Sequence, residues 1–141
     1  MTDIKYALRG ITVEQFATLF EPTSDRFEIL VSIPIKTNYD ERSLAVGANI
    51  QYVEDGKTFL TAEVFCHYEI EKECWDNLSE GNTKDVVLPK ELMDSLARIA
   101  IGTARGAICV KTENSVFAKY YLPIIEIGAS HEKNGFVIPR T

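Results

Sequence analysis

Apolar and polar residues alternate along much of the first half of the chain, a period of two that is typical of β-strands with one buried face. The clearest strand spans residues 27–35, and its alternating apolar positions are Phe27, Ile29, Val31, Ile33 and Ile35. Pro34 cannot donate a hydrogen bond to a neighbouring strand, so we expect a strand end or a sheet edge there. Residues 4–20 alternate less regularly, and a short helix over residues 16–20 is the alternative. We predict a strand that is broken or bent at Gly10.

A hairpin is predicted around Glu54-Asp55-Gly56. Apolar residues recur at every second position on both sides of this turn: Leu44, Val46, Ala48, Ile50 and Tyr52 before it, and Leu60, Ala62, Val64, Cys66, Tyr68 and Ile70 after it. A slip of one residue would turn a whole apolar face to water. A three-residue loop with Gly56 in the left-handed conformation keeps both apolar sets on one face. We therefore predict that Ile50 lies opposite Leu60 and Ala48 opposite Ala62.

The period changes to three and four after a polar, turn-rich segment, residues 71–85, which we expect to be a crossing loop. Val86-Val87-Leu88 is extended and apolar, and Pro89 and Glu91 suit the first turn of a helix. Apolar residues then follow at helical spacing: Leu92, Met93, Leu96, Ala97, Ile99, Ala100 and Ala104. Arg105 and Gly106 are typical of a helix end, so we expect a helix of about 17 residues.

Gly102 lies inside this predicted helix, where it costs roughly 1 kcal/mol relative to alanine. Either the helix tolerates it, or another helix or strand approaches closely there. Pro123 prevents a helix through the last apolar run, so we expect one or two helical turns over residues 115–121 and then an extended tail. Residues 131–141 are polar, so we expect disorder there, with Phe136, Val137 and Ile138 as an anchor. Strands in one block and helices in another predict an α+β fold in one domain, 1–141, with about four antiparallel strands before the long helix.

Composition narrows the class of protein. The chain has 21 acidic and 15 basic residues and a net charge of -6, which argues against nucleic acid as a main partner. Its three cysteines do not resemble a disulfide framework, so we expect the reducing cytoplasm. We see neither the pattern of a signal peptide nor an apolar run long enough for membrane insertion.

Candidate chemistry is sparse. Cys66, His67 and Cys74 lack the pair spacings of a zinc site. A cysteine nucleophile needs a partnered base in a cleft, whereas Cys109 follows the predicted helix end amid apolar residues, which favours packing. Phosphate-binding, dinucleotide-binding and serine-hydrolase motifs do not occur. We therefore predict a protein without catalytic residues, metal or cofactor.

Large apolar residues are in surplus outside the predicted strands and the long helix. They are Trp75, Leu78, Phe117, Tyr120, Tyr121, Leu122, Ile124 and Ile125. One interpretation is that they cover the second face of the sheet or a subunit interface. The other is a groove for extended apolar polypeptides, walled by aromatic side chains.

The order of these elements resembles the SecB export-chaperone family and its SecB-like relatives. The residues that carry the likeness are Val87-Leu88-Pro89, residues 91–101 and Arg105-Gly106, with residues 4–16 similar in position to that family's first strand and Gly56 at its central hairpin. The resemblance implies a cytoplasmic, ATP-independent chaperone (a holdase) that binds unfolded or pre-export polypeptides and needs no nucleotide.

The same resemblance implies a homo-oligomer, a dimer of dimers with the long helices packed between the dimers. The interface residues on this helix would be Leu92, Leu96, Ile99 and Gly102. The client groove would be lined by Trp75, Leu78, Phe117, Tyr120 and Tyr121. Acidic strand residues such as Glu63 and Glu69 would face the export motor ATPase.

The chain departs from the family at its last residues, GFVIPRT, because the export chaperone ends in an acidic tail that docks the motor. This departure puts the motor in doubt and fits a SecB-like chaperone dedicated to one client, such as an antitoxin. A second class is a small hot-dog-like thioesterase, in which the long helix precedes most strands and the catalytic carboxylate would here be Glu91 or Asp94. A third is a structural subunit whose apolar surplus forms an interface.

Overall fold

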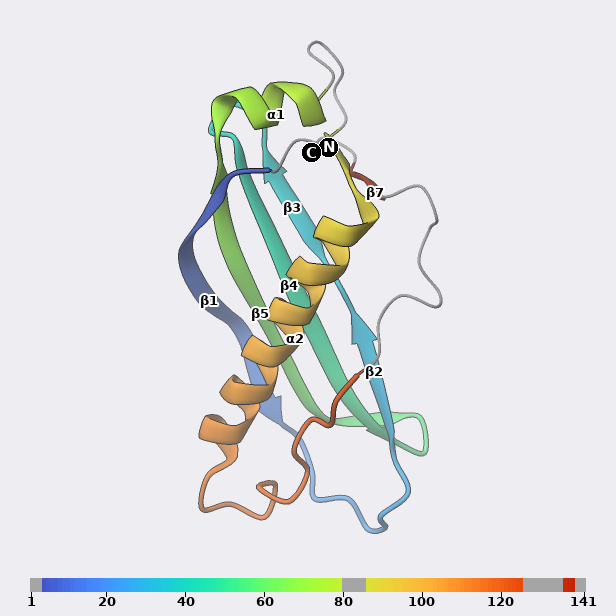
Figure 1. Ribbon diagram of the computed structural model, residues 1–141. Helices are drawn as coiled ribbons and strands as arrows, with labels where there is room; N and C mark the ends of the chain where they lie inside the picture. Colours follow the sequence, from blue (N-terminus) through green and yellow to red (C-terminus); the bar gives the residue numbers. More distant parts are fainter. Residues whose placement is uncertain (1–3, 80–85, 126–135, 139–141) are drawn as a thin grey trace.

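A five-stranded antiparallel sheet carries one long helix on one of its faces, and β6 and β7 form a separate two-stranded sheet. The computed structural model describes residues 4–79, 86–125 and 136–138 (Figure 1). In chain order the elements are β1 (Tyr6–Thr18), β2 (Glu28–Ser32), β3 (Ile35–Asn38), β4 (Ser43–Glu54), β5 (Lys57–Ile70), α1 (Lys72–Leu78), β6 (Val86–Leu88), α2 (Lys90–Thr112) and β7 (Phe136–Ile138). The predicted α+β class, with the strands of the sheet followed by a long helix, is confirmed.

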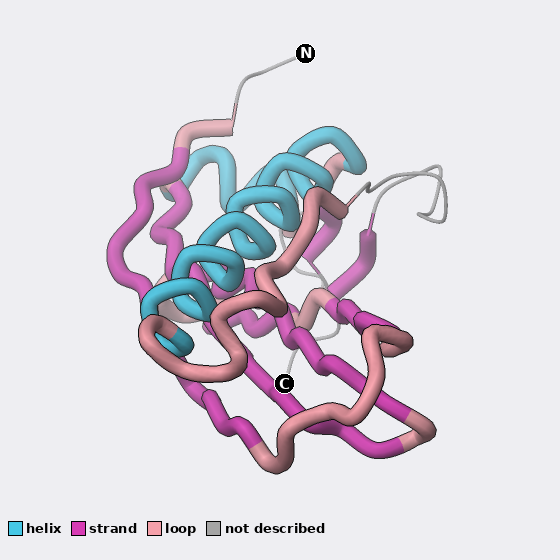
Figure 2. The backbone as a smooth tube through the Cα atoms, turned by 90° about the horizontal axis from the view of Figure 1, so that it is seen from below, coloured by secondary structure: helices cyan, strands magenta, loops and turns pink. Residues whose placement is uncertain are grey.

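The sheet has the strand order β1-β5-β4-β2, and β3 pairs with β4 beyond the end of β2. The helix α2 packs against β4 and β5, and Figure 2 shows α2 and the chain that follows it on the same side of the sheet. Every apolar residue that the alternation of β4 and β5 predicted to face inward is at most 3% exposed. Because burial of each large side chain stabilises by about 1.5–3 kcal/mol, this face forms the core.

The predicted register of the β4–β5 hairpin was wrong by two residues, although the assignment of faces was correct. Ile50 lies opposite Ala62, not Leu60. The turn is a two-residue loop in which both Asp55 and Gly56 have positive φ, 50° and 77°. A bulge at Phe59 then restores the apolar pairing, because Tyr52 lies opposite Leu60 while Val53 lies opposite Thr58.

The strand predicted over residues 27–35 is two strands, β2 and β3, separated at Ile33-Pro34. The missing N–H of Pro34 ends the ladder there, and its carbonyl accepts a hydrogen bond from the Gly47 N–H at 2.8 Å. The strand β1 is continuous, without a helix at its end. Its register shifts between Leu8 and Gly10, as the prediction of a bend at Gly10 required, and shifts again between Val13 and Gln15.

Both helices differ from the prediction. The segment predicted as a crossing loop contains α1, which buries Cys74, Trp75 and Leu78. The long helix α2 has 23 residues and passes Gly106 without interruption. Burial of Ile108, which is 0% exposed, outweighs a cost of roughly 1 kcal/mol for the exposed glycine. The helix ends at Thr112, and the left-handed residue that follows it is Asn114, with a φ of 60°. The prediction had placed this helix-ending residue at Gly106.

Beyond α2 the chain forms hydrogen-bonded turns over residues 115–120, where one or two helical turns were predicted. Residues 120–125 belong to neither a helix nor a strand, in keeping with the helix break expected at Pro123. Phe136–Ile138, the predicted anchor, pairs with Val86–Leu88. The rest of the predicted polar end, residues 131–135 and 139–141, lies outside the described residues. Neither helix in the described ranges has the length and apolar character needed to cross a membrane.

Candidate polypeptide-binding surface

The structure does not bring the five predicted groove residues together. Trp75 and Leu78 belong to α1 and are buried in the core, where Trp75 is 1% exposed and its ring lies 5.6 Å from that of Tyr39. Phe117, Tyr120 and Tyr121 follow the opposite end of α2 (Figure 1). The two sets therefore cannot line one groove within a single chain.

A groove of about 300 Å³ lies where the second of these sets meets the start of β2. It is lined by Asp25, Phe27, Ile29, Lys119, Tyr120, Tyr121 and Pro123. The Tyr120 ring packs on its buried side, 5.4 Å from both the Phe27 and Phe59 rings, whereas Tyr121 is 70% exposed. The apolar surplus in the sequence predicts Tyr120 and Tyr121 at a groove. It does not predict Phe27 and Ile29, because their alternation indicates only the buried face of a strand.

The wall of this groove after α2 consists of residues 119–125, which we call the tail segment. Lys119 ends the last turn, and residues 120–125 belong to neither a helix nor a strand. Its side chains alternate, with Tyr120 and Leu122 buried and Tyr121 and Pro123 exposed, as expected for extended chain. Arg105 of α2 holds this backbone: its Nε donates to the carbonyl of Leu122 and its Nη2 to the carbonyl of Pro123, both at 2.8 Å. Ile124, the next residue, is 88% exposed.

The facing wall is positioned by Glu54 at the end of β4. Its carboxylate accepts hydrogen bonds from the backbone N–H groups of Thr23 and Ser24 at 3.0 and 2.9 Å, and from the Ser24 hydroxyl. Those hydrogen bonds, led by the Thr23 N–H, hold the pKa of Glu54 below its ordinary value. Glu54 thereby fixes the loop that leads into Asp25 and Phe27.

A second apolar surface lies along the edge strand β1. We call it the β1 surface, and its residues are Tyr6, Leu8, Ile11 and Val13, which are 40–52% exposed. They pair with Ile70, Tyr68, Cys66 and Val64 of β5 and so point to the side of the sheet that carries α2. Because α2 packs on β4 and β5, these side chains project beyond the helix. An exposed apolar edge strand is a template for pairing with another chain.

The helix residues predicted at an oligomer interface divide between core and surface. Leu96 is 1% exposed and belongs to the core, and Leu92 is half-buried against it. Ile99 and Gly102 are exposed. An added Cβ at Gly102 would meet only the Arg105 side chain, at 3.8 Å, so close approach of another element is not the reason for this glycine within the described chain.

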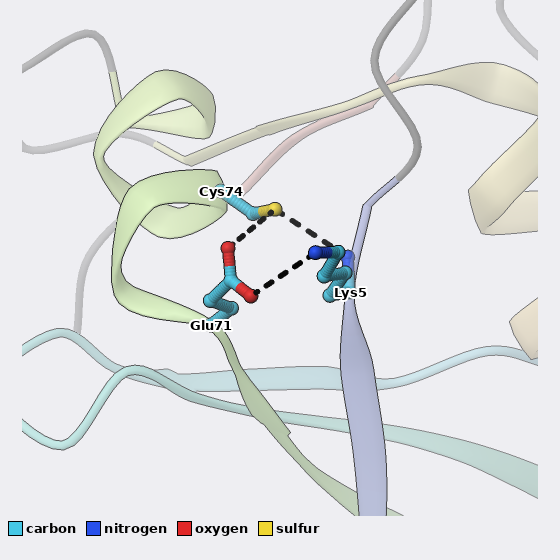
Figure 3. A network of polar contacts seen from close by, with 3 residues as sticks. All are labelled: Lys5, Glu71 and Cys74. Atoms are coloured by element: carbon cyan, nitrogen blue, oxygen red, sulfur yellow. Dashed lines mark hydrogen bonds and ion pairs between the residues drawn. The ribbon is translucent and has the colours of Figure 1, made fainter.

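Polar groups elsewhere make structural contacts. Within the described ranges, no three His, Cys, Asp or Glu side chains cluster in a way that could hold a metal ion. Figure 3 shows Cys74 between the Lys5 backbone N–H at 3.4 Å and a Glu71 oxygen at 3.8 Å, a network that ties the start of β1 to α1. On the sheet face away from α2, Glu63 accepts from Asn49 and Glu69 pairs with Arg9.

No protein-family model matches the chain, and comparisons with curated proteins and with solved structures found no match.

Proposed function

We propose that this protein is an ATP-independent holdase that binds apolar segments of unfolded or pre-export polypeptides in the groove beside Tyr121. The observation that carries the proposal is this groove, with its aromatic and aliphatic lining beside the exposed side chains of Tyr121 and Ile124. Exposed apolar surface of this kind marks sites where proteins bind other proteins. The SecB-like order of elements supports the same activity, in the cytoplasm and without nucleotide.

The groove suits an extended client. Its volume of about 300 Å³ is at the small end of ligand sites, so it accepts one or two large side chains while the rest of the polypeptide passes outside. The groove residue Ile29 belongs to β2, which lies at the edge of the described sheet. An extended polypeptide beside an edge strand can add main-chain hydrogen bonds that do not depend on its sequence.

Replacing Tyr121 with serine should weaken binding at least roughly tenfold, the loss expected when one aromatic anchor is removed from an interface. The measurement is aggregation suppression of a denatured reporter without nucleotide, together with fluorescence anisotropy of a labelled peptide rich in leucine and phenylalanine. Leu30→Ser is the matched control, because Leu30 is 50% exposed on the other face of β2, away from the groove.

A Tyr121→Ser protein as active as the wild type would remove the groove from the proposal. If the wild type suppressed no reporter and bound no peptide, the general holdase would be wrong. A chaperone of one dedicated client, or a structural subunit, would then be the remaining choices.

We further propose that the β1 surface pairs with a second copy of the chain. The residues of β1 on the α2 side of the sheet are Tyr6, Leu8, Ile11, Val13, Phe16 and Thr18. This set is symmetric about Thr12, so antiparallel pairing of two β1 strands would place Ile11 opposite Val13, Leu8 opposite Phe16 and Tyr6 opposite Thr18. All apolar side chains would then stay on one face of a continuous sheet.

The two bulges of β1 support this pairing because they also lie symmetrically about Thr12. The extra residues are at Arg9-Gly10 and Glu14-Gln15, where the register with β5 shifts. In the proposed pair, the Arg9-Gly10 bulge of one strand would lie opposite the Glu14-Gln15 bulge of the other. The pairing of the flanking residues across the two strands would therefore stay in register. Arg9 of one copy would lie opposite Gln15 of the other, and Gly10 opposite Glu14, so that no like charges would lie opposite each other in the pair.

Ile11→Lys should halve the native mass, because it would place two lysines in the middle of the joined apolar face. Sedimentation velocity over a range of protein concentrations measures this mass. Leu30→Lys adds the same charge at a site of similar exposure on β2 and should leave the mass unchanged. A wild type that is monomeric at every concentration, or an Ile11→Lys protein of wild-type mass, would contradict the pairing.

A further inference from the structure

The charged side chain of Arg105 donates its hydrogen bonds to the tail segment. Its two hydrogen bonds reach 17 and 18 residues along the chain, to the successive carbonyls of Leu122 and Pro123. Within the described residues Arg105 has no carboxylate at ion-pair distance. Hydrogen bonds from a charged donor are roughly twice as strong as neutral ones. The side chain therefore holds the backbone of the tail segment against α2.

Arg105 lies directly behind the groove. Tyr121 and Pro123, which line the groove, flank the carbonyl of Leu122 that Arg105 holds. The buried side chains of Tyr120 and Leu122 anchor the tail segment on the core side, at 5% and 1% exposure. Arg105 also lies close to buried Tyr52: burial raises the pKa of Tyr52, and the positive charge of Arg105 acts against that rise. The two hydrogen bonds of the guanidinium group thus join α2 to the outer wall of the groove.

We infer that Arg105 is a positioning residue for client binding, which holds the tail segment in the geometry that accepts an apolar polypeptide segment. This inference rests on the proposed holdase function. A wall that is ordered before binding costs no further conformational entropy when the client binds, so the affinity is higher. Arginine suits the task because its planar fork reaches two carbonyls at once, whereas lysine offers a single ammonium group.

The test compares Arg105→Gln, Arg105→Lys and the control Arg98→Gln, which changes an exposed arginine elsewhere on the same helix. The probe is the labelled leucine- and phenylalanine-rich peptide, with anisotropy as the readout. We expect Arg105→Gln to raise the Kd about tenfold, Arg105→Lys to fall between it and the wild type, and Arg98→Gln to match the wild type.

Hydrogen exchange of the free proteins provides a readout that does not depend on a client. Arg105→Gln should speed amide exchange in residues 119–125 and leave the protection of α2 and β4 unchanged. Loss of protection throughout α2 would show that Arg105 is needed for the fold, and it would overturn the positioning role.

The two proposals fail in different ways. If the wild type binds the peptide and Arg105→Gln binds it equally well, the positioning role is wrong and the holdase function stands. If the wild type itself binds no peptide, the holdase function is wrong, and the client role of Arg105 is wrong with it.

Discussion

Replacing Trp75 with alanine is expected to lower the free energy of unfolding by about 3–5 kcal/mol. The indole is 1% exposed, belongs to the main core cluster and packs edge-on against the Tyr39 ring, at 5.6 Å and 62°. Its removal would leave a large cavity between α1 and the sheet. Because domains are stable by only about 5–15 kcal/mol, this change would remove a large fraction of the stability.

Urea unfolding followed by circular dichroism measures the effect without relying on tryptophan fluorescence. Trp75→Phe should cost less than about 1.5 kcal/mol, because it keeps most of the volume and removes an indole N–H that has no hydrogen-bond partner among the described residues. Tyr121→Ala is the exposed aromatic control and should change stability by no more than about 0.5 kcal/mol. A Trp75→Ala protein as stable as the wild type would show that the indole does not belong to the core.

The contrast between Trp75 and Tyr121 shows what the sequence could predict about the site. Both belong to apolar groups outside the predicted elements, and composition alone does not separate a core residue from a groove residue. A signal was present for Trp75, because Cys74, Trp75 and Leu78 have helical spacing and α1 places all three on its buried side. Tyr120 and Tyr121 are neighbours in extended chain, so one must point inward, and only the tertiary structure shows which.

The strands were predictable in their faces and less so in their pairing. Alternation identified the inward residues of β4 and β5 except Phe59, because a period of two depends on local sequence alone. Phe59 lies at the bulge and is 0% exposed in the core. The register was missed because the bulge at Phe59 compensates for a tight turn, and no local pattern marks such a pair of features. The local sequence likewise marks Arg105 only as a cation near a helix end, whereas its hydrogen-bond partners lie 17 and 18 residues further on. Contacts at that separation are set by packing.

Gly47→Ala is the second large effect that the structure predicts, with a loss of about 3 kcal/mol, at the upper end for overpacked sites. Gly47 lies in the central strand β4, directly opposite Phe65 of β5, on the face away from α2. A Cβ on Gly47 would be 2.6 Å from the Val64 carbonyl oxygen and 2.8 Å from the Phe65 ring. Backbone of a central strand cannot move aside cheaply, so the added methyl group would distort the ladder.

The Phe65 ring has little freedom to yield. It is 1% exposed although it lies on the face of the sheet without a helix, because Lys36 covers it, with Nζ 4.2 Å from the ring centroid. The Lys36 Nζ also forms an ion pair with the Glu14 carboxylate of β1, at 3.7 Å. The covering side chain therefore links β3 to β1 across the sheet. Displacing the ring would disturb this cation–π contact and the ion pair as well as β4.

Gly106→Ala is the matched control and should act in the opposite direction. Gly106 lies on the exposed face of α2 with nothing within 4 Å of an added Cβ, so alanine should stabilise the protein by about 0.5–1 kcal/mol. The two variants add the same methyl group, and urea unfolding should separate them by roughly 4 kcal/mol. Equal stabilities would show that Phe65 does not pack on Gly47. A Gly47→Ala loss that Phe65→Leu partly relieves would instead locate the strain at the ring, because only neighbouring sites deviate from additivity.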